Sequence, residues 1–249
     1  MTLSRFRTII AISITTLLAS CACQENYDKV PAEAVAEYDV LYSHDIKESF
    51  GSVGNFLPSK AVVHFNNNGL SIESKGALGM YKMSIICTTT DAFVTFNYDV
   101  HKLIIPLEGI NSLMSGISLS DSINIIRKDT KYTQVCGMEA TDIEMVSRSP
   151  FGDVNISAFY VPTEDNGNRL SLGNIKIPGL PTTLNISSGE SNIVVRLKSI
   201  HAEKVDDEIF ARPAGYIEVS IEEFDAIAES LNLKPESASN LQDYLPSSK

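Results

Sequence analysis

The residue whose surroundings most clearly predict a chemical reaction is Cys21, which follows Leu18, Ala19 and Ser20. These three residues form the box of a bacterial lipoprotein signal, and the cysteine that follows such a box is the residue that accepts the lipid. The small side chains of Ala19 and Ser20 let an extended backbone enter a peptidase, and the Cys21 thiol can be alkylated by diacylglycerol before cleavage on its N-terminal side. The pattern therefore predicts that lipidated Cys21 becomes the first residue of the mature chain.

Residues 1–20 have the order of a signal peptide. Arg5 and Arg7 are the only charged residues before the cysteine, and residues 9–19 form an apolar core interrupted by hydroxyl side chains. A helix that spans a bilayer needs about 20 apolar residues, so this segment is too short to remain as one. Two or more acyl chains hold a protein stably at a membrane. The alternative is an ordinary secretory signal, cleaved nearby, that leaves Cys21 as a spare thiol.

Three further cysteines, Cys23, Cys87 and Cys136, would remain in an oxidising compartment, where thiols tend to pair. Cys23 falls in a predicted tether, so the sequence favours a disulfide between Cys87 and Cys136. Two buried free thiols are the alternative. The chain has no CxxC pair, which argues against a zinc site or a redox motif.

The remaining side chains carry no recognisable catalytic pattern. The histidines are far apart in the sequence and form no HExxH motif: His44, His64, His101 and His201. No GxSxG elbow, P-loop or GxGxxG occurs. We therefore expect no enzyme, no metal and no cofactor. The formal net charge of −11 disfavours nucleic acid as a partner, so attachment to a membrane must come from the lipid.

After the signal, the sequence predicts a flexible tether (21–34), a single β-rich domain (35–233) and a polar C-terminal tail (234–249). Apolar residues alternate with polar ones in many segments of the domain, which is typical of strands with one buried face. These segments lie near residues 38–42, 61–65, 70–74, 81–87, 94–98, 141–146, 154–161, 182–186 and 193–200. Asn, Gly and Asp clusters separate several of them, so we expect an antiparallel sheet of hairpins.

Helix signals are sparse. Ser220 and Glu223 have the spacing of a capping box, with Phe224, Ile227 and Leu231 on one face of the predicted helix. A second, shorter amphipathic segment is indicated by helical spacing of four apolar residues: Ile110, Leu113, Met114 and Ile117. We expect a mainly β (α+β) domain with a few short helices.

Three motifs in the second half follow a familiar order: Cys-Gly-Met-Glu-Ala (136–140), Ile-Pro-Gly-Leu-Pro (177–181) and Phe-Ala-Arg-Pro-Ala-Gly-Tyr (210–216). Over residues 130–220 the chain resembles a family of uncharacterised Gram-negative periplasmic proteins and lipoproteins grouped with the LolA-like and LolB-like lipoprotein carriers. The resemblance implies a strongly curved antiparallel sheet, a half-barrel whose concave face holds acyl chains. It also implies a lid over that face, formed by Ile110, Leu113, Met114 and Ile117.

Two functions remain open. The first is a non-enzymatic lipoprotein, lipid-anchored in the outer membrane on its periplasmic face or at the cell surface, that binds a lipid or acyl chain in a curved β cavity. The second is a structural or interaction lipoprotein with a packed core that binds an envelope protein. Since the chain carries its own anchor, it looks more like a resident receiver or a cell-envelope accessory than a shuttle.

Overall fold

The computed structural model describes residues 27–49, 57–76, 79–107, 123–149, 152–163, 170–172, 175–177 and 179–230. The lipidation box (Leu18, Ala19, Ser20), Cys21 and the C-terminal tail lie outside these residues. So does the predicted lid segment, Ile110 to Ile117. The following paragraphs concern the described part of the chain.

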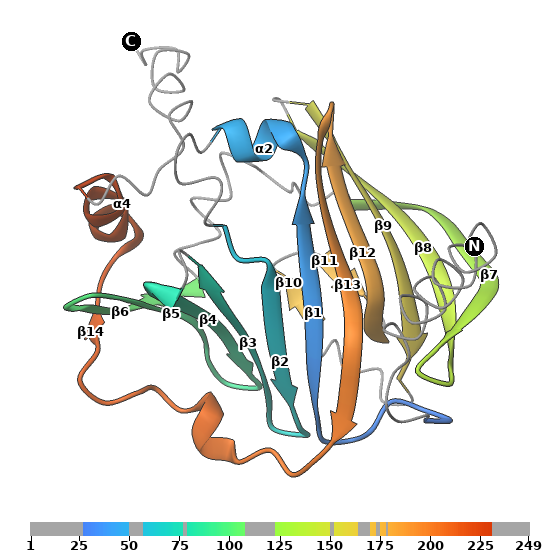
Figure 1. The fold of residues 1–249 in the computed structure, drawn as a ribbon, viewed down its shortest axis with the longest axis horizontal. Coiled ribbons are helices and arrows are strands. Elements are labelled where there is room, and N and C mark those ends of the chain that lie inside the picture. Colours follow the sequence, from blue (N-terminus) through green and yellow to red (C-terminus); the bar gives the residue numbers. More distant parts are fainter. Residues whose placement is uncertain are drawn as a thin grey trace, which may run out of the picture.

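The domain is mainly β, as the sequence predicts, and is built around one large sheet (Figure 1). The strands are β1 (Ala34–Tyr42), β2 (Lys60–Phe65), β3 (Gly69–Gly76), β4 (Tyr81–Thr88), β5 (Ala92–Tyr98), β6 (His101–Pro106), β7 (Ile123–Val135), β8 (Met138–Ser149), β9 (Gly152–Pro162), β10 (Leu170–Leu172), β11 (Ile175–Ile177), β12 (Gly179–Ser188), β13 (Ser191–Ala202) and β14 (Ile217–Glu218). Helices α2 (His44–Ser49) and α4 (Ile221–Ser230) and the 3-10 helix η4 (Asp207–Phe210) complete the elements.

The strand order of the sheet is β14-β6-β5-β4-β3-β2-β1-β13-β12-β9-β8-β7. Neighbouring strands are antiparallel except β14 and β6. The first strand therefore lies between two meanders, one formed by β2–β6 and the other by β7, β8, β9, β12 and β13. The sheet is curved and not closed, and β10 pairs with β11 in a separate hairpin.

The alternation of side chains gives the sheet two chemically different faces. Ala36 pairs with Val63 of β2 and with Ile200 of β13, so these three side chains share one face, which we call the inner face. Glu37, the next residue, lies on the opposite, outer face. The curvature brings inner-face side chains together, since Tyr42 of β1 and Tyr81 of β4 interact electrostatically across two intervening strands.

A tight apolar cluster, which we call the core end, packs around the start of β1. It collects buried residues from the start of β1 and from the strand ends around it: Ala34, Ala36, Tyr38, Val63, Phe65, Leu70, Cys136, Met138, Ala140, Val161, Leu180 and Ile200. Tyr27 and Val30, which the sequence assigned to the tether, pack against this cluster. The chain before β1 is therefore part of the packed structure from Tyr27 onward.

Tight turns hold neighbouring strands in register. Cys136 and Gly137, both with positive φ (52° and 82°), connect β7 to β8 as a two-residue hairpin of the kind that matches strand twist. Between β2 and β3 the Asn66 side chain accepts hydrogen bonds from the N–H groups of Asn68 and Gly69. The second turn follows from the Asn66–Gly69 cluster in the sequence.

The C-terminal segment wraps around the β6 edge of the sheet and covers both faces. On the outer face, Phe210 of η4 packs with Ile86, Phe93 and Ile104, and its ring lies over Gly69, where a Cβ would come within 2.8 Å of it. β14 then pairs with β6, and α4 returns on the inner face. The predicted capping box is confirmed: Ser220 N–H donates to Glu223 Oε2, and Glu223 N–H donates to Ser220 Oγ.

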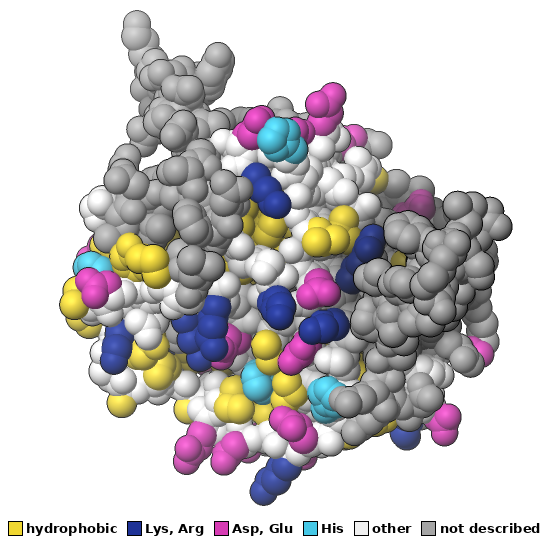
Figure 2. Space-filling model, viewed as in Figure 1, with side chains coloured by type: hydrophobic (Ala, Val, Ile, Leu, Met, Phe, Trp, Pro, Cys, Tyr) yellow, Lys and Arg dark blue, Asp and Glu magenta, His cyan; other side chains and the backbone are white. Residues whose placement is uncertain are grey.

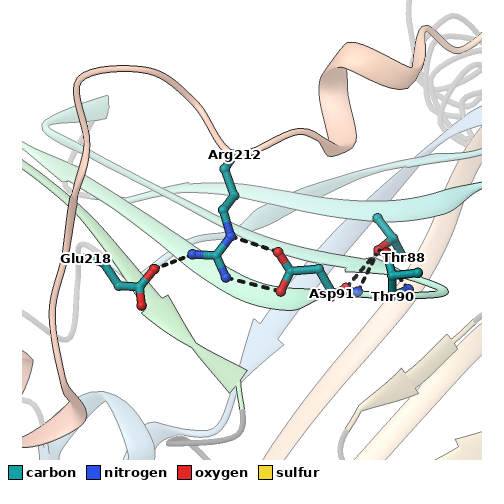
Figure 3. Close-up of polar contacts among 5 residues, drawn as sticks. All are labelled: Thr88, Thr90, Asp91, Arg212 and Glu218. Carbon is teal, nitrogen blue, oxygen red and sulfur yellow. Dashed lines mark hydrogen bonds and ion pairs between the residues drawn. The ribbon is translucent and has the colours of Figure 1, made fainter.

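Arg212 fastens this segment to the β4–β5 turn (Figure 3). Its guanidinium donates to both carboxylate oxygens of Asp91, at 2.7 and 3.2 Å, and also binds Glu218. Thr88 Oγ1 accepts from Asp91 N–H and thereby orients the acidic residue. The guanidinium also lies 5.1 Å from the ring centroid of Phe93. Hydrogen bonding from Arg212 lowers the pKa of Asp91. The stabilisation that the Arg212–Asp91 ion pair gives the folded state is therefore lost only when the pH falls through that lowered pKa.

We predict that Phe210→Ala lowers the free energy of unfolding by about 3–5 kcal/mol, the usual loss when a buried aromatic side chain is truncated. The measurement is urea unfolding followed by circular dichroism. Ile209→Ala is the matched control, because Ile209 belongs to the same turn but is 40% exposed. Equal losses for the two variants would contradict the role given to Phe210.

Candidate functional site: the inner face of the sheet

On strands β1–β6, β9, β12 and β13, the positions that pairing assigns to the inner face hold no acidic residue, lysine or arginine. At the far edge of the sheet, pairing places Lys128 and Lys131 of β7 opposite the inner-face residues Ile143 and Thr141 of β8. On β4 the inner-face positions are Tyr81, Met83, Ile85 and Cys87. Corresponding positions on the other strands are also mostly Val, Ile, Leu, Ala or an aromatic residue. An uncharged surface of this size provides a favourable environment only for apolar groups.

Two covers bury the flanks of the inner face. Phe224 of α4 packs edge-on against Phe96, with ring centroids 5.4 Å apart, above an apolar cluster from β5 and β6. On the other flank, Ile177 of the β10–β11 hairpin is buried against residues of β8, β9 and β12, including Ile143 and Leu184. Both flanks are therefore solid packed core.

Between these covers, a central apolar strip is only partly buried. Its members are Val40, Tyr42, Ala61, Ile72, Met83, Ile85, Ile193, Val195 and Leu197. They come from β1, β2, β3, β4 and β13, and they lie beside the core end, against which Ala61, Ile72, Val195 and Leu197 pack. The sequence predicted these strands. It described the apolar site only through a lid at Ile110–Ile117, and it did not identify the strip residues as members of the site. The alternation in β4 and β13 was the signal that could have identified the strip.

Several tyrosines place hydroxyl groups on the inner face. Burial raises the pKa of Tyr38 far above its ordinary value, and its hydroxyl donates a 2.9 Å hydrogen bond to the Pro181 carbonyl. Burial, followed by the influence of Tyr81, raises the pKa of Tyr42 to about 12. Tyr81, whose pKa is also raised by burial, stacks near Phe96 at 6.1 Å between centroids. These phenols are neutral at physiological pH and can donate hydrogen bonds without placing charge on the face.

The outer face is charged instead, as Figure 2 shows around the central strands. Asp39 stands opposite Lys60 and Arg196 in the neighbouring strands. Glu73 binds Lys75 and Lys82 at 3.1 and 2.6 Å. Burial alone would raise the pKa of Glu73, but the two lysines lower it overall. The contrast between the faces leaves the inner face as the candidate site for an apolar ligand.

The cysteines correct one prediction from the sequence. Cys87 is a free thiol on the inner face of β4, and Cys136, in the β7–β8 turn, is disulfide-bonded. The predicted disulfide between Cys87 and Cys136 is therefore wrong. The sequence argument excluded Cys23 as part of a loose tether, whereas Tyr27 holds the chain just after it against Cys136.

The described residues add no sign of metal chemistry. His64 lies on β2 and His101 on β6, as ordinary strand positions, while His44 is in α2 and His201 in β13. Within the described ranges, no three His, Cys, Asp or Glu side chains gather in a way that could hold a metal ion. In that same part of the chain, no helix has the length and apolar character needed to cross a membrane.

Comparisons with protein-family models and with curated proteins give no match. Among solved structures, the chain is similar to LprF from Mycobacterium bovis, with 11% identity, a TM-score of 0.32, and coverage of 74% of this chain and 90% of that one. It is also similar to a β-barrel-like protein of domain of unknown function DUF1849 from Brucella abortus. That match has 8% identity and a TM-score of 0.23, and it covers 72% of this chain and 100% of that one. Function is therefore argued from the inner face itself.

The Cys87 thiol gives a direct test of the environment of the inner face. Burial raises its pKa, so less of it is thiolate at pH 8 than in the unfolded chain. We predict that iodoacetamide alkylates Cys87 several-fold more slowly in the folded protein than in urea, and that the folded rate keeps rising at pH values where the unfolded rate has levelled off. Mass spectrometry of the alkylated peptide measures both rates, with Cys87→Ser as the blank. Equal rates in the two states would contradict this environment.

Proposed function

We propose that this chain is a membrane-anchored, non-enzymatic envelope lipoprotein that binds a lipid or acyl chain on the inner face of its sheet. The lipidation box at Leu18–Cys21 supports the anchor. The central apolar strip supports the binding activity, since it remains partly uncovered between α4 and the β10–β11 hairpin. The strip is the single observation on which the binding proposal rests.

The chemistry of the strip favours a hydrocarbon chain over a polar ligand. Each methylene that leaves water for an apolar surface contributes about 0.8 kcal/mol. The strands that supply the strip place no lysine or arginine on the inner face that could pair with a carboxylate or phosphate, so a charged headgroup over the strip would have to remain in solvent. The hydroxyls of Tyr42 and Tyr81, and that of Ser74 between Ala61 and Met83, are polar groups that a glycerol or ester oxygen could meet. The proposed ligand therefore lies with its chain along the strip and its headgroup outside.

Filling the strip should block binding. Ala61 points to the inner face beside Tyr38, whereas its neighbour Val62 points to the outer face between Glu37 and Glu73. We predict that Ala61→Phe weakens binding of a dansyl-labelled fatty acid by about tenfold, which corresponds to about 1.4 kcal/mol. Val62→Phe, the matched control, should bind as the unaltered protein does. Fluorescence titration measures the affinities, and circular dichroism checks that both variants are folded.

The outcomes of this titration separate the two functions. If the unaltered, folded protein binds no acyl probe, the binding proposal is wrong and the alternative of a packed-core lipoprotein that binds an envelope protein gains support. If Val62→Phe weakens binding as much as Ala61→Phe, the ligand does not occupy the strip.

The anchor has its own test. We predict that radioactive palmitate is incorporated into the unaltered protein and the Cys23→Ala variant, and that Cys21→Ala abolishes incorporation, because only Cys21 follows the Leu18–Ser20 box. Gel autoradiography of membranes from expressing cells reports the result. Labelling of both variants would contradict lipidation at Cys21.

A further inference from the structure

The disulfide of Cys136 raises the question of its partner. The chain has four cysteines, Cys21, Cys23, Cys87 and Cys136. Since Cys136 is disulfide-bonded and Cys87 is free, the partner is Cys21 or Cys23. Both lie outside the described residues, so the choice between them depends on the chain that leads away from them.

That chain is held directly at the β7–β8 turn. Tyr27 N–H donates to the Cys136 carbonyl at 2.9 Å, and the Tyr27 hydroxyl accepts a hydrogen bond from Ala202 N–H at 2.8 Å. The Tyr27 side chain also packs against the core end. Tyr27 lies four positions after Cys23, and an extended chain of that length reaches about 13 Å. This length allows Cys23 to approach Cys136 to the Cα separation of about 4.4–6.8 Å that a disulfide requires.

We infer that Cys23 is the partner of Cys136, and that Cys21 is left free to carry the lipid; this second part rests on the proposed lipidation. In the exchange, the Cys23 and Cys136 thiols each lose a proton and together give two electrons to the disulfide of a thiol oxidoreductase of the oxidising compartment. That oxidoreductase leaves as a dithiol. The new bond closes a loop that runs from the mature N-terminus to the β7–β8 turn.

The bond would set how the domain stands on the membrane. Without it, the six chain positions between Cys21 and Tyr27 allow the lipid and the sheet to lie up to about 20 Å apart. With it, this separation is set by the two chain positions from Cys21 to Cys23, about 7 Å. The core end would then lie against the membrane that holds the anchor.

Peptide mapping of the lipidated protein tests the pairing. The protein is extracted from membranes, alkylated without reduction and digested with trypsin, which cleaves after Lys29, Lys82, Lys102, Lys131 and Arg148. We expect residues 132–148 to be recovered as a disulfide-linked pair with the lipid-bearing peptide that ends at Lys29. Residues 83–102 should be recovered with alkylated Cys87. In Cys23→Ser, Cys136 should become alkylated and the melting temperature should fall, whereas Cys87→Ser should leave both unchanged.

The possible results distinguish this inference from the proposed function. A lipid-bearing N-terminal peptide together with an alkylated Cys136 would overturn the disulfide and leave the anchor intact. A link between Cys21 and Cys136 would overturn both the inference and the lipidation. Binding of the acyl probe by the inner face is measured separately and depends on neither result.

Discussion

The structure depends on the register of its strands, because period-two alternation sorts charged and apolar side chains onto opposite faces. In β1, Ala36, Tyr38 and Val40 point inward, while Glu37 and Asp39 point outward. A slip of one residue would put both carboxylates on the inner face, in an apolar environment where an unpaired charge is strongly disfavoured. The pairing of β1 with both β2 and β13 therefore determines the chemistry of the whole inner face.

A second constraint comes from the strands that are apolar on both faces. Leu103, Ile104 and Ile105 of β6 form a continuous apolar run, so both sides of this edge need cover. The C-terminal segment supplies it by passing from η4 on the outer face, along β14, to α4 on the inner face. Within the part of the chain that the structure describes, α4 covers this flank and the β10–β11 hairpin covers the other, and the central apolar strip between them is partly buried.

The sequence predicted the features that local chemistry determines. Alternation identified nine strands, and the Ser220–Glu223 spacing identified the cap of α4. It missed β6, whose run of three apolar residues has no alternation, and β7, whose pairing with β8 is interrupted by register shifts. The disulfide was wrong because the spatial closeness of Tyr27 and Cys136 is a tertiary contact that sequence spacing does not encode. The strip was missed as a site because its members come from five strands.

The central claim is that the inner face holds an acyl chain. Native mass spectrometry of the folded, Cys21→Ala protein, purified from the periplasm without detergent, tests it most directly, since a chain buried on the strip should survive transfer to the gas phase. The account predicts an adduct with the mass of a fatty acid or phospholipid, which Ala61→Phe removes and Val62→Phe retains. A protein that is folded and free of any lipid adduct, and that takes up none from added vesicles, would contradict it.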